Sequence, residues 1–362
     1  MKTIISDNID IECQNMITAF LDVEFIKSKI MKAYPNLSAT KQKTISEDIR
    51  FYINQGLELY AVSDTSINTI PLTLFYSLNN FVKAAYLLRF PNLSLTGSHG
   101  IDLKSNELQA CNGISDVEVH FTKKGTFVNL TELTDDKFDF ANAVRLKDLF
   151  SVIPELCNIY ALIYSEESNV YLMQGKKECA SSYKVLFQTD NSEAISRKDT
   201  SLLSRNGYHL YIQNDFDSIY GDMSLTEDSW GKEDNVIYYD SHGNKYCTNG
   251  IRYGGNIIKP SKICNLYICY YTFSMLVRYY PSLWIKFCNS KEVSLINKLL
   301  TNMKSTMLIE IIQLLSGERY VFTSQIAEMD KDLAYSEVLK KLLKEMRIEN
   351  RRRGKSILSD YI

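Results

Sequence analysis

The period of the hydrophobic pattern changes along the chain, and this change constrains the fold more than any other feature of the sequence. From Ile11 to Phe90, and again from Ser261 onward, apolar residues recur at intervals of three and four, as they do on one face of an α-helix. Between these parts, apolar residues alternate with polar ones in short Tyr- and Val-rich runs that are typical of β-strands. The sequence therefore predicts an α+β fold. Mostly α-helical N- and C-terminal parts pack together, and an antiparallel β-rich middle region is inserted between them in sequence.

We expect three parts: an N-terminal helical part at residues 1–90, a β-rich middle at 91–260 with one helix at about 145–164, and a C-terminal helical part with a basic tail at 261–362. The first part should contain three helices, at residues 13–34, 44–62 and 71–90. Pro35 separates the first two, Pro71 suits the first turn of the third, and Pro91 stops it. Ser46 is expected in an early turn of the second helix.

The middle part is expected to begin with a β-hairpin. In its first strand, polar residues alternate with Val117, Val119 and Phe121. The turn is expected at Lys123 to Gly125, and residues 126–128 are expected to form the second strand, antiparallel to the first. Pro154 either kinks the helix at 145–164 or opens a second segment. Further strands are expected at residues 169–173, 183–188, 208–213 and 235–249, the last being a hairpin that turns at residues 242–244.

The sequence indicates a cytoplasmic protein. Its N-terminus carries no secretory signal pattern, and the most apolar run, residues 263–277, is too short to cross a bilayer, so it predicts a buried helix. The eight cysteines are scattered, which favours reduced thiols over disulfides, although an even count leaves disulfides open. Neither CxxC nor a Cys/His pair at metal-binding spacing occurs, so we expect no metal site and no cofactor.

The net charge of the chain and the absence of known phosphate-binding motifs exclude several classes of function. Forty-one Lys and Arg residues against 43 Asp and Glu residues give a net charge of -2, so the chain lacks the global positive field of a typical nucleic-acid binder. The P-loop and Rossmann glycine patterns are missing, and residues 253–256 are too short to serve as a phosphate loop. Any surface that attracts phosphate must therefore be local.

Three segments resemble the YaaC-like family of bacterial proteins. They are PLTLFYSLNNFVKAAYLLRF followed by SHGI, LKDLFSVIPELCNIY, and LYICYYTFSMLVRYYPSLW, and their order and spacing match as well. The resemblance covers about residues 70 to 360 and implies a helical protein of the bacterial cytoplasm with no assigned reaction. The His-Gly and Arg-Tyr…Trp features of the family fall here on His99-Gly100 and on Arg278-Tyr279 with Trp284.

The third helix and the loop after it supply one group of candidate residues. Tyr76, Asn79, Asn80 and Lys83 fall on one face of that helix, with Arg89 and His99 downstream, so this face is a candidate site for a phosphate or an acidic partner. The alternative is a solvated face or an internal hydrogen-bond network. Gly100 allows backbone to approach closely beside His99, which serves either as a site residue or in a structural role.

Arg278 ends the most apolar helix and is followed by aromatic residues, including Trp284. Its guanidinium either contributes to a ligand site or stacks on these aromatics in a structural role. A HEPN-type ribonuclease would need an Arg and a His separated by four intervening residues on a helix. Arg205 and His209 have only three residues between them, and Leu283 stands where Arg278 would need a histidine. Asp116, Glu118 and Lys123 have the residue types of a metal-dependent nuclease but not its spacing.

The C-terminal tail supplies candidate contacts to nucleic acid. A further helix is expected at residues 332–348, and the basic residues on it and after it are Lys340, Lys341, Lys344, Arg347, Arg351, Arg352, Arg353 and Lys355. The alternative is a solvated chain end, because acidic residues are interspersed among them.

These features favour a cytoplasmic protein that binds a macromolecule and lacks a recognisable catalytic constellation. We expect a protein partner or self-association, nucleic acid as a second option through the basic tail, and no membrane. A component of a defence or stress system would fit this description. The alternative is a hydrolytic effector, either a HEPN-like ribonuclease or a nucleotide-directed enzyme with a non-standard site. It would use some of Lys83, Arg89, His99 and Arg278, and it requires the residues it uses to converge in one pocket.

Overall fold

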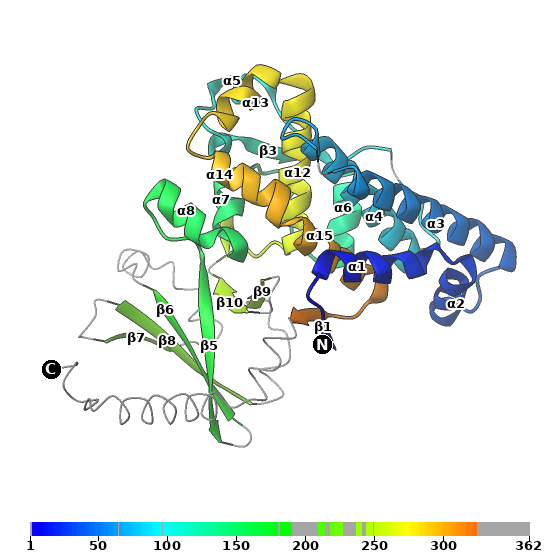
Figure 1. Cartoon of the computed structure of the whole chain (residues 1–362), viewed down its shortest axis with the longest axis horizontal. Coiled ribbons are helices and arrows are strands. Elements are labelled where there is room, and N and C mark those ends of the chain that lie inside the picture. The colour runs from blue at the N-terminus through cyan, green and yellow to red at the C-terminus, as the bar shows by residue number, and fades with distance from the viewer. Residues whose placement is uncertain are drawn as a thin grey trace, which may run out of the picture.

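The computed structural model describes residues 2–63, 65–95, 97–179, 182–189, 209–213, 218–226, 237–240, 244–248 and 250–323 (Figure 1). Helices dominate these residues, and the strands form small sheets. The α+β class predicted from the sequence is therefore confirmed. Figure 1 shows the helices gathered in one body, with the sheet that contains β5 to β8 on one side of it.

The N-terminal part begins with a strand and continues as four α-helices. Its elements are β1 (Lys2–Ile5), α1 (Ile9–Thr18), the 3₁₀ turn η1 (Ala19–Leu21), α2 (Val23–Ala33), α3 (Ala39–Ala61) and α4 (Ile70–Arg89). The single helix predicted at residues 13–34 is wrong, because Asp22 caps a new helix by accepting hydrogen bonds from the N–H groups of Glu24 and Phe25. Pro71 lies in the first turn of α4, as predicted.

The start of α3 also differs from the prediction. Ser38 caps it by accepting a hydrogen bond from the N–H of Lys41. Ser46 lies about two turns farther on, where its buried hydroxyl donates to the carbonyl of Gln42. Ser46 is therefore an interior helix residue and does not mark the helix start.

Helix α4 is the centre of the helical body. It packs against α3, α6 (Thr126–Thr134), α12 (Lys262–Tyr279) and α15 (Lys304–Ser316). Helix α12 contains the apolar run 263–277 and is buried along most of its length, which confirms that this run is a buried helix. Contacts of α12 and α15 with α4, and of α15 with α1, join the two helical ends of the chain.

The C-terminal part completes this body. Its remaining elements are α13 (Pro281–Cys288), α14 (Val293–Asn297), the π-helical turn η4 (Lys298–Asn302) and β13 (Tyr320–Thr323). Strand β13 pairs in parallel with β1, so the first and last described segments lie side by side. The helix predicted at residues 332–348 lies outside the described residues.

The first half of the middle part alternates short strands with short helices. Its elements are β2 (Ile101–Asp102), α5 (Ser105–Ala110), η2 (Ile114–Asp116), β3 (Glu118–Phe121), α6, β4 (Val144–Arg145), α7 (Leu146–Ser151), η3 (Pro154–Leu156) and α8 (Cys157–Tyr164). Strand β3 pairs antiparallel with β2 on one side and with β4 on the other. Pro154 opens a second helical segment, which is one of the two outcomes that the sequence allowed.

The hairpin predicted at residues 117–128 is wrong. Gly125 has a φ of 137°, and after it the chain enters α6 and does not return along β3. The N–H groups of Thr126 and Phe127 donate to the carbonyls of Ser98 and His99, which satisfies the free donors at the start of the helix. Strand β3 instead pairs with β2 and β4.

The second half of the middle part contains two sheets. The larger has the order β7-β8-β6-β5-β10-β9 with antiparallel neighbours. Its strands are β5 (Val170–Cys179), β6 (Ser182–Thr189), β7 (His209–Gln213), β8 (Ser218–Thr226), β9 (Ile237–Tyr239) and β10 (Lys245–Thr248). The smaller is the hairpin of β11 (Ile251–Tyr253) and β12 (Asn256–Ile258).

The prediction that residues 91–260 form an antiparallel β-rich region is not supported as a whole. Helices α5 to α8 occupy more of residues 101–164 than strands do, because hydrophobic alternation there is confined to stretches of two to four residues. Residues 190–208 and 227–236 lie outside the described residues. For the second half of the middle part, a continuous β-rich region therefore stays a prediction.

Within the described ranges, none of the helices combines the length and the apolar character that a bilayer span requires.

The contact between α3 and α4 gives a stability prediction. A Cβ atom at Gly56 would lie 2.6 to 2.9 Å from three ring carbons of Phe81, which is fully buried. We expect Gly56→Ala to destabilise the fold by about 1–2 kcal/mol, because overpacking costs about 1–3 kcal/mol while the helix propensity of alanine returns at most about 1 kcal/mol. Urea unfolding followed by tryptophan fluorescence measures this difference.

Gly97→Ala is the matched control. A Cβ atom at Gly97 would meet nothing within 4 Å, so its effect should stay within about 0.5 kcal/mol. Equal midpoints for Gly56→Ala and the unmodified protein would contradict tight packing at this contact.

Candidate functional site

The structure brings together three of the residues that the sequence singled out. Lys83 comes from α4, His99 from the loop before β2, and Arg278 from the last turn of α12. Burial lowers the pKa of His99, and the charges of Lys83 and of Arg278 each lower it further. Both cations therefore act on the same imidazole, and we call Lys83, His99 and Arg278 the cationic cluster.

The backbone around His99 is held by the start of α6. The carbonyls of Ser98 and His99 accept hydrogen bonds from Thr126 and Phe127, both at 2.9 Å. Gly100 has a φ of 84°, and a Cβ atom at Gly125 would lie 2.2 Å from the Gly100 nitrogen. Two glycines therefore let the chain segments approach closely here, which is the backbone role that the sequence suggested for Gly100.

The imidazole of His99 is half-buried among aromatic rings. Its centroid lies 5.0 Å from that of Phe75, 6.1 Å from Tyr76 and 5.7 Å from Tyr271. Its Nδ1 atom is buried and has no hydrogen-bond partner among the residues that the structure describes. With its pKa lowered by burial and by the two cations, His99 is neutral at pH 7.

Arg278 lies at the exposed rim of the cluster. Its guanidinium donates hydrogen bonds to the hydroxyls of Tyr76 and Tyr279, each at 2.7 Å. It also lies 4.7 Å from the ring centroid of Tyr279, a cation–π distance. The stacking that the sequence suggested as a structural role is therefore present, and it holds the guanidinium in place beside His99.

Lys83 is the half-buried cation of the cluster. Its Nζ lies 5.4 Å from the ring centroid of Tyr52, and burial lowers its pKa. Neither Lys83 nor Arg278 forms an ion pair with a carboxylate in the described part of the chain. Asp102 acts on the neighbouring Tyr271, whose pKa burial raises to about 12.

The other candidates do not join this cluster. Arg89 is exposed at the end of α4, where it lines a separate cavity. Trp284 is buried, donates from Nε1 to Asn68 at 2.9 Å and packs on Phe273, so it belongs to the core. Asn80 is buried in α4 on the face that carries Tyr76 and Lys83. The basic residues of the tail, from Lys340 to Lys355, lie outside the described residues.

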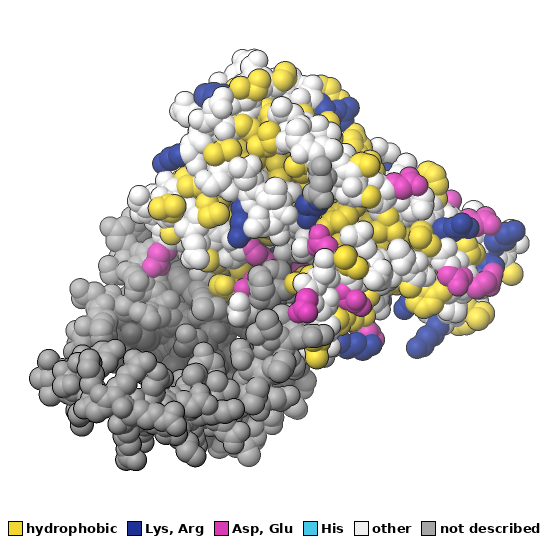
Figure 2. All heavy atoms as spheres, viewed as in Figure 1, with side chains coloured by type: hydrophobic (Ala, Val, Ile, Leu, Met, Phe, Trp, Pro, Cys, Tyr) yellow, Lys and Arg dark blue, Asp and Glu magenta, His cyan; other side chains and the backbone are white. Residues whose placement is uncertain are grey.

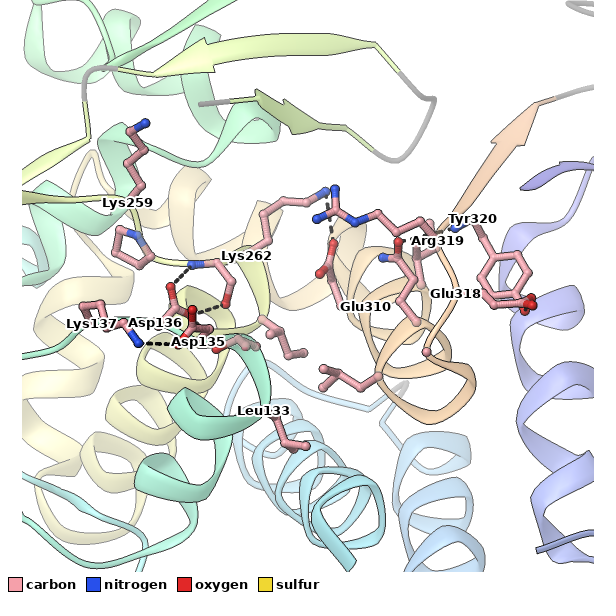
Figure 3. A pocket seen from close by; sticks show the side chains of 18 of the residues that line it. Leu133, Asp135, Asp136, Lys137, Lys259, Lys262, Glu310, Glu318, Arg319 and Tyr320 are labelled. Carbon is pink, nitrogen blue, oxygen red and sulfur yellow. Dashed lines mark hydrogen bonds and ion pairs between the residues drawn. The ribbon is translucent and has the colours of Figure 1, made fainter. Parts of the chain in front are cut away.

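A cavity of about 750 Å³ lies between α6, α12, α15 and β13 (Figure 3). In the described part of the chain, some of the charged groups that line it, Lys262 above all, have charged partners, unlike Lys83 and Arg278 of the cationic cluster. Lys262 lies 3.3 Å from a carboxylate oxygen of Glu155 and 3.7 Å from one of Glu310, and Asp136 accepts hydrogen bonds from Ser261. These pairs join the ends of helices that are distant in sequence, so we assign them a structural role.

Two aromatic residues that contact the cationic cluster were not predicted from the sequence. Tyr271 contacts His99 from α12, and Tyr52 lies against Lys83 from α3. Nothing in the sequence distinguishes these two tyrosines from the other apolar and aromatic residues of their helices. Their position beside the cluster follows from the packing of α3 and α12 on α4.

The geometry favours binding over acid–base catalysis. Two cations, one neutral imidazole and several tyrosine hydroxyls can donate hydrogen bonds to an anion. A general base would in addition need a group that orients its second ring nitrogen, and Nδ1 of His99 has no such partner in the described residues.

Comparisons with known proteins give one match. A family model described as YaaC-like Protein matches residues 18–315, which include the whole cationic cluster. No curated protein and no solved structure matches the chain.

The electrostatic coupling in the cluster is testable by NMR. We expect His99 to titrate below 6.5, the ordinary histidine value, and Lys83→Met to raise this pKa because it removes a nearby positive charge. Imidazole proton shifts recorded against pH would measure both values.

Lys43→Met, which removes an exposed lysine of α3, is the control and should leave the His99 titration unchanged. A His99 pKa that is insensitive to Lys83 would show that the two side chains do not share one site. The pKa of His99 is lower in the folded state than in the unfolded state, so the unfolded chain takes up the proton first. The free energy of unfolding should therefore decrease as the pH falls below about 6.5.

Proposed function

The chain belongs to the YaaC-like family, and we propose that it is a cytoplasmic binding protein whose cationic cluster holds an anionic group, foremost a phosphate, of a macromolecular partner. One observation carries this proposal: Arg278 bonds the hydroxyl of Tyr76, whose ring lies 6.1 Å from that of His99, and neither Arg278 nor the half-buried Lys83 forms an ion pair with a described carboxylate. A part in a defence or stress system is a further proposal that rests on the resemblance alone.

The energetics of Lys83 support an anionic ligand. Half-burying an ammonium group without a counter-charge costs free energy, and the lowered pKa of Lys83 reflects that cost. An anion placed between Lys83 and Arg278 would offset it with charge-assisted hydrogen bonds. A guanidinium has five N–H donors, and the two tyrosine hydroxyls leave some of them available for a ligand.

The rim of the cluster supports a macromolecular partner. Tyr279 is 55% exposed beside Arg278, and tyrosine and arginine are among the residues that contribute most to binding interfaces. On the face shown in Figure 2, basic and acidic side chains are interspersed over the helical body. On that face the basic side chains therefore do not form one continuous positive surface, in keeping with the net charge of -2.

A hydrolytic effector that acts on RNA or a nucleotide is the second candidate. The observation in its favour is a neutral imidazole beside two cations, since a general base must be unprotonated and cations stabilise a developing phosphate charge. The missing orienting partner of Nδ1 makes it the weaker of the two.

Binding to a labelled mixed-sequence RNA oligonucleotide and to inorganic phosphate tests the proposal. We expect Arg278→Gln and Lys83→Gln to weaken binding about tenfold or more, since a hydrogen bond to a charged group is worth about 1.5–3 kcal/mol. Fluorescence anisotropy measures RNA binding, and isothermal titration calorimetry measures phosphate binding.

Arg89→Gln is the matched control, because it removes a cation of the same helix that lies outside the cluster. RNA bound in the unmodified protein and lost in both cluster variants would support a nucleic-acid partner. Phosphate binding without RNA binding would support a phosphorylated protein. Equal binding by the cluster variants and Arg89→Gln, or none to either probe, would refute the proposed site, and RNA cleavage abolished by His99→Ala would favour the hydrolytic candidate.

A further inference from the structure

A second set of polar side chains gathers on the three-stranded sheet of β2, β3 and β4. Glu107 of α5 and Glu118 and His120 of β3 each present one ligand atom, and these atoms all lie within 4.8 Å of one another. We propose that these three residues bind a divalent transition-metal ion, with Zn²⁺ as the best fit. This proposal is independent of the anion site and would stand if that site were refuted.

Strand β3 fixes two of the three ligands. Residues two apart on a strand point to the same face, so Glu118 and His120 lie side by side. Because β3 pairs with β2 and β4, it is the central strand of its sheet, and its backbone is held from both sides. Helix α5 brings Glu107 opposite them, where Oε2 of Glu107 lies 2.6 Å from Nε2 of His120.

Neighbouring cations orient both carboxylates. Lys104 bonds Oε1 of Glu107 at 3.2 Å, and Arg145 donates from Nε to Oε1 of Glu118 at 3.0 Å. Each carboxylate is therefore held by one oxygen, and in Glu107 the other oxygen faces His120. Partners of this kind orient the ligands of many metal sites.

The ligand set determines the class of ion. One imidazole nitrogen and two carboxylate oxygens suit Zn²⁺, whereas Mg²⁺ and Ca²⁺ prefer oxygen alone. Three protein ligands leave coordination positions for water or a substrate atom. The side chains of Glu107 and His120 are 32% and 20% exposed, so an ion can enter from solvent.

A hydrogen bond connects the helix that carries Glu107 with the segment that follows Arg278. Ser105 of α5 bonds the hydroxyl of Tyr280 at 2.6 Å, and Tyr280 follows Arg278 by two residues. The proposed ion and the cationic cluster therefore lie on adjoining elements.

Titration of the metal-free full-length protein with Zn²⁺ in a calorimeter, and with Co²⁺ by visible absorption, tests this inference. We expect one saturable site per chain and weak Co²⁺ bands without a thiolate charge-transfer band, since the ligands are nitrogen and oxygen. Binding should weaken as the pH falls, because protons compete for His120. His120→Gln and Glu118→Gln should each weaken binding by about tenfold or more, at least as much as losing an orienting partner does.

Glu47→Gln, which alters an exposed carboxylate of α3, is the matched control and should bind as the unmodified protein does. Thermal unfolding of each variant without metal verifies that it is folded, and because the two ligand variants act independently, either one alone is sufficient for the test. No saturable Zn²⁺ binding, or binding that folded His120→Gln and Glu118→Gln retain in full, would overturn the inference.

Discussion

A helix that is buried on most sides must find a partner for each polar side chain it carries, and α4 meets this constraint residue by residue. Asn79 accepts a hydrogen bond from the hydroxyl of Tyr267 at 2.8 Å, and Ser77 donates to the carbonyl of Gly56 at 2.8 Å. Tyr86 donates to a carboxylate oxygen of Glu132 at 2.9 Å. These bonds fix α12, α3 and α6 around α4. Lys83 departs from this pattern, because in the described part of the chain its Nζ lies over the ring of Tyr52 and forms no ion pair with a carboxylate.

A buried carboxylate joins the segment before α14 to η2 and α8. Glu292, before α14, accepts hydrogen bonds from the N–H of Ile114 at 2.6 Å and from the hydroxyl of Tyr164 at 2.7 Å. A Cβ atom at Gly113 would lie 2.2 Å from the same carboxylate, so a glycine is required for this approach. A single side chain thus ties the C-terminal helices to η2 and α8, and through η2 to the sheet of β3.

The sequence predicted those elements whose signals are local. Pro71, Pro91 and Pro154 mark boundaries because proline restricts the backbone wherever it stands. The hairpin at residues 117–128 failed because the start of α6 is stabilised by the carbonyls of Ser98 and His99, almost thirty residues away. The convergence of Lys83, His99 and Arg278 likewise depends on how α12 crosses α4, and no spacing in the sequence encodes that crossing. The sequence also pointed to Glu118 but not to its grouping with Glu107 and His120, since α5 and β3 must meet before the three side chains come together.

Two buried or half-buried lysines of this molecule, Lys262 and Lys83, differ in whether a described carboxylate lies close enough to offset their positive charge. Lys262 is fully buried, yet the charges of Glu155 and Glu310 offset the effect of burial, and its pKa is raised. Lys83 is less buried, yet its pKa is lowered because no described carboxylate offsets the cost. The fold therefore neutralises one buried lysine with two glutamates, whereas it offers Lys83 no described carboxylate. In the proposal made above, an anion from outside the chain would supply the charge that Lys83 and Arg278 lack among its described residues.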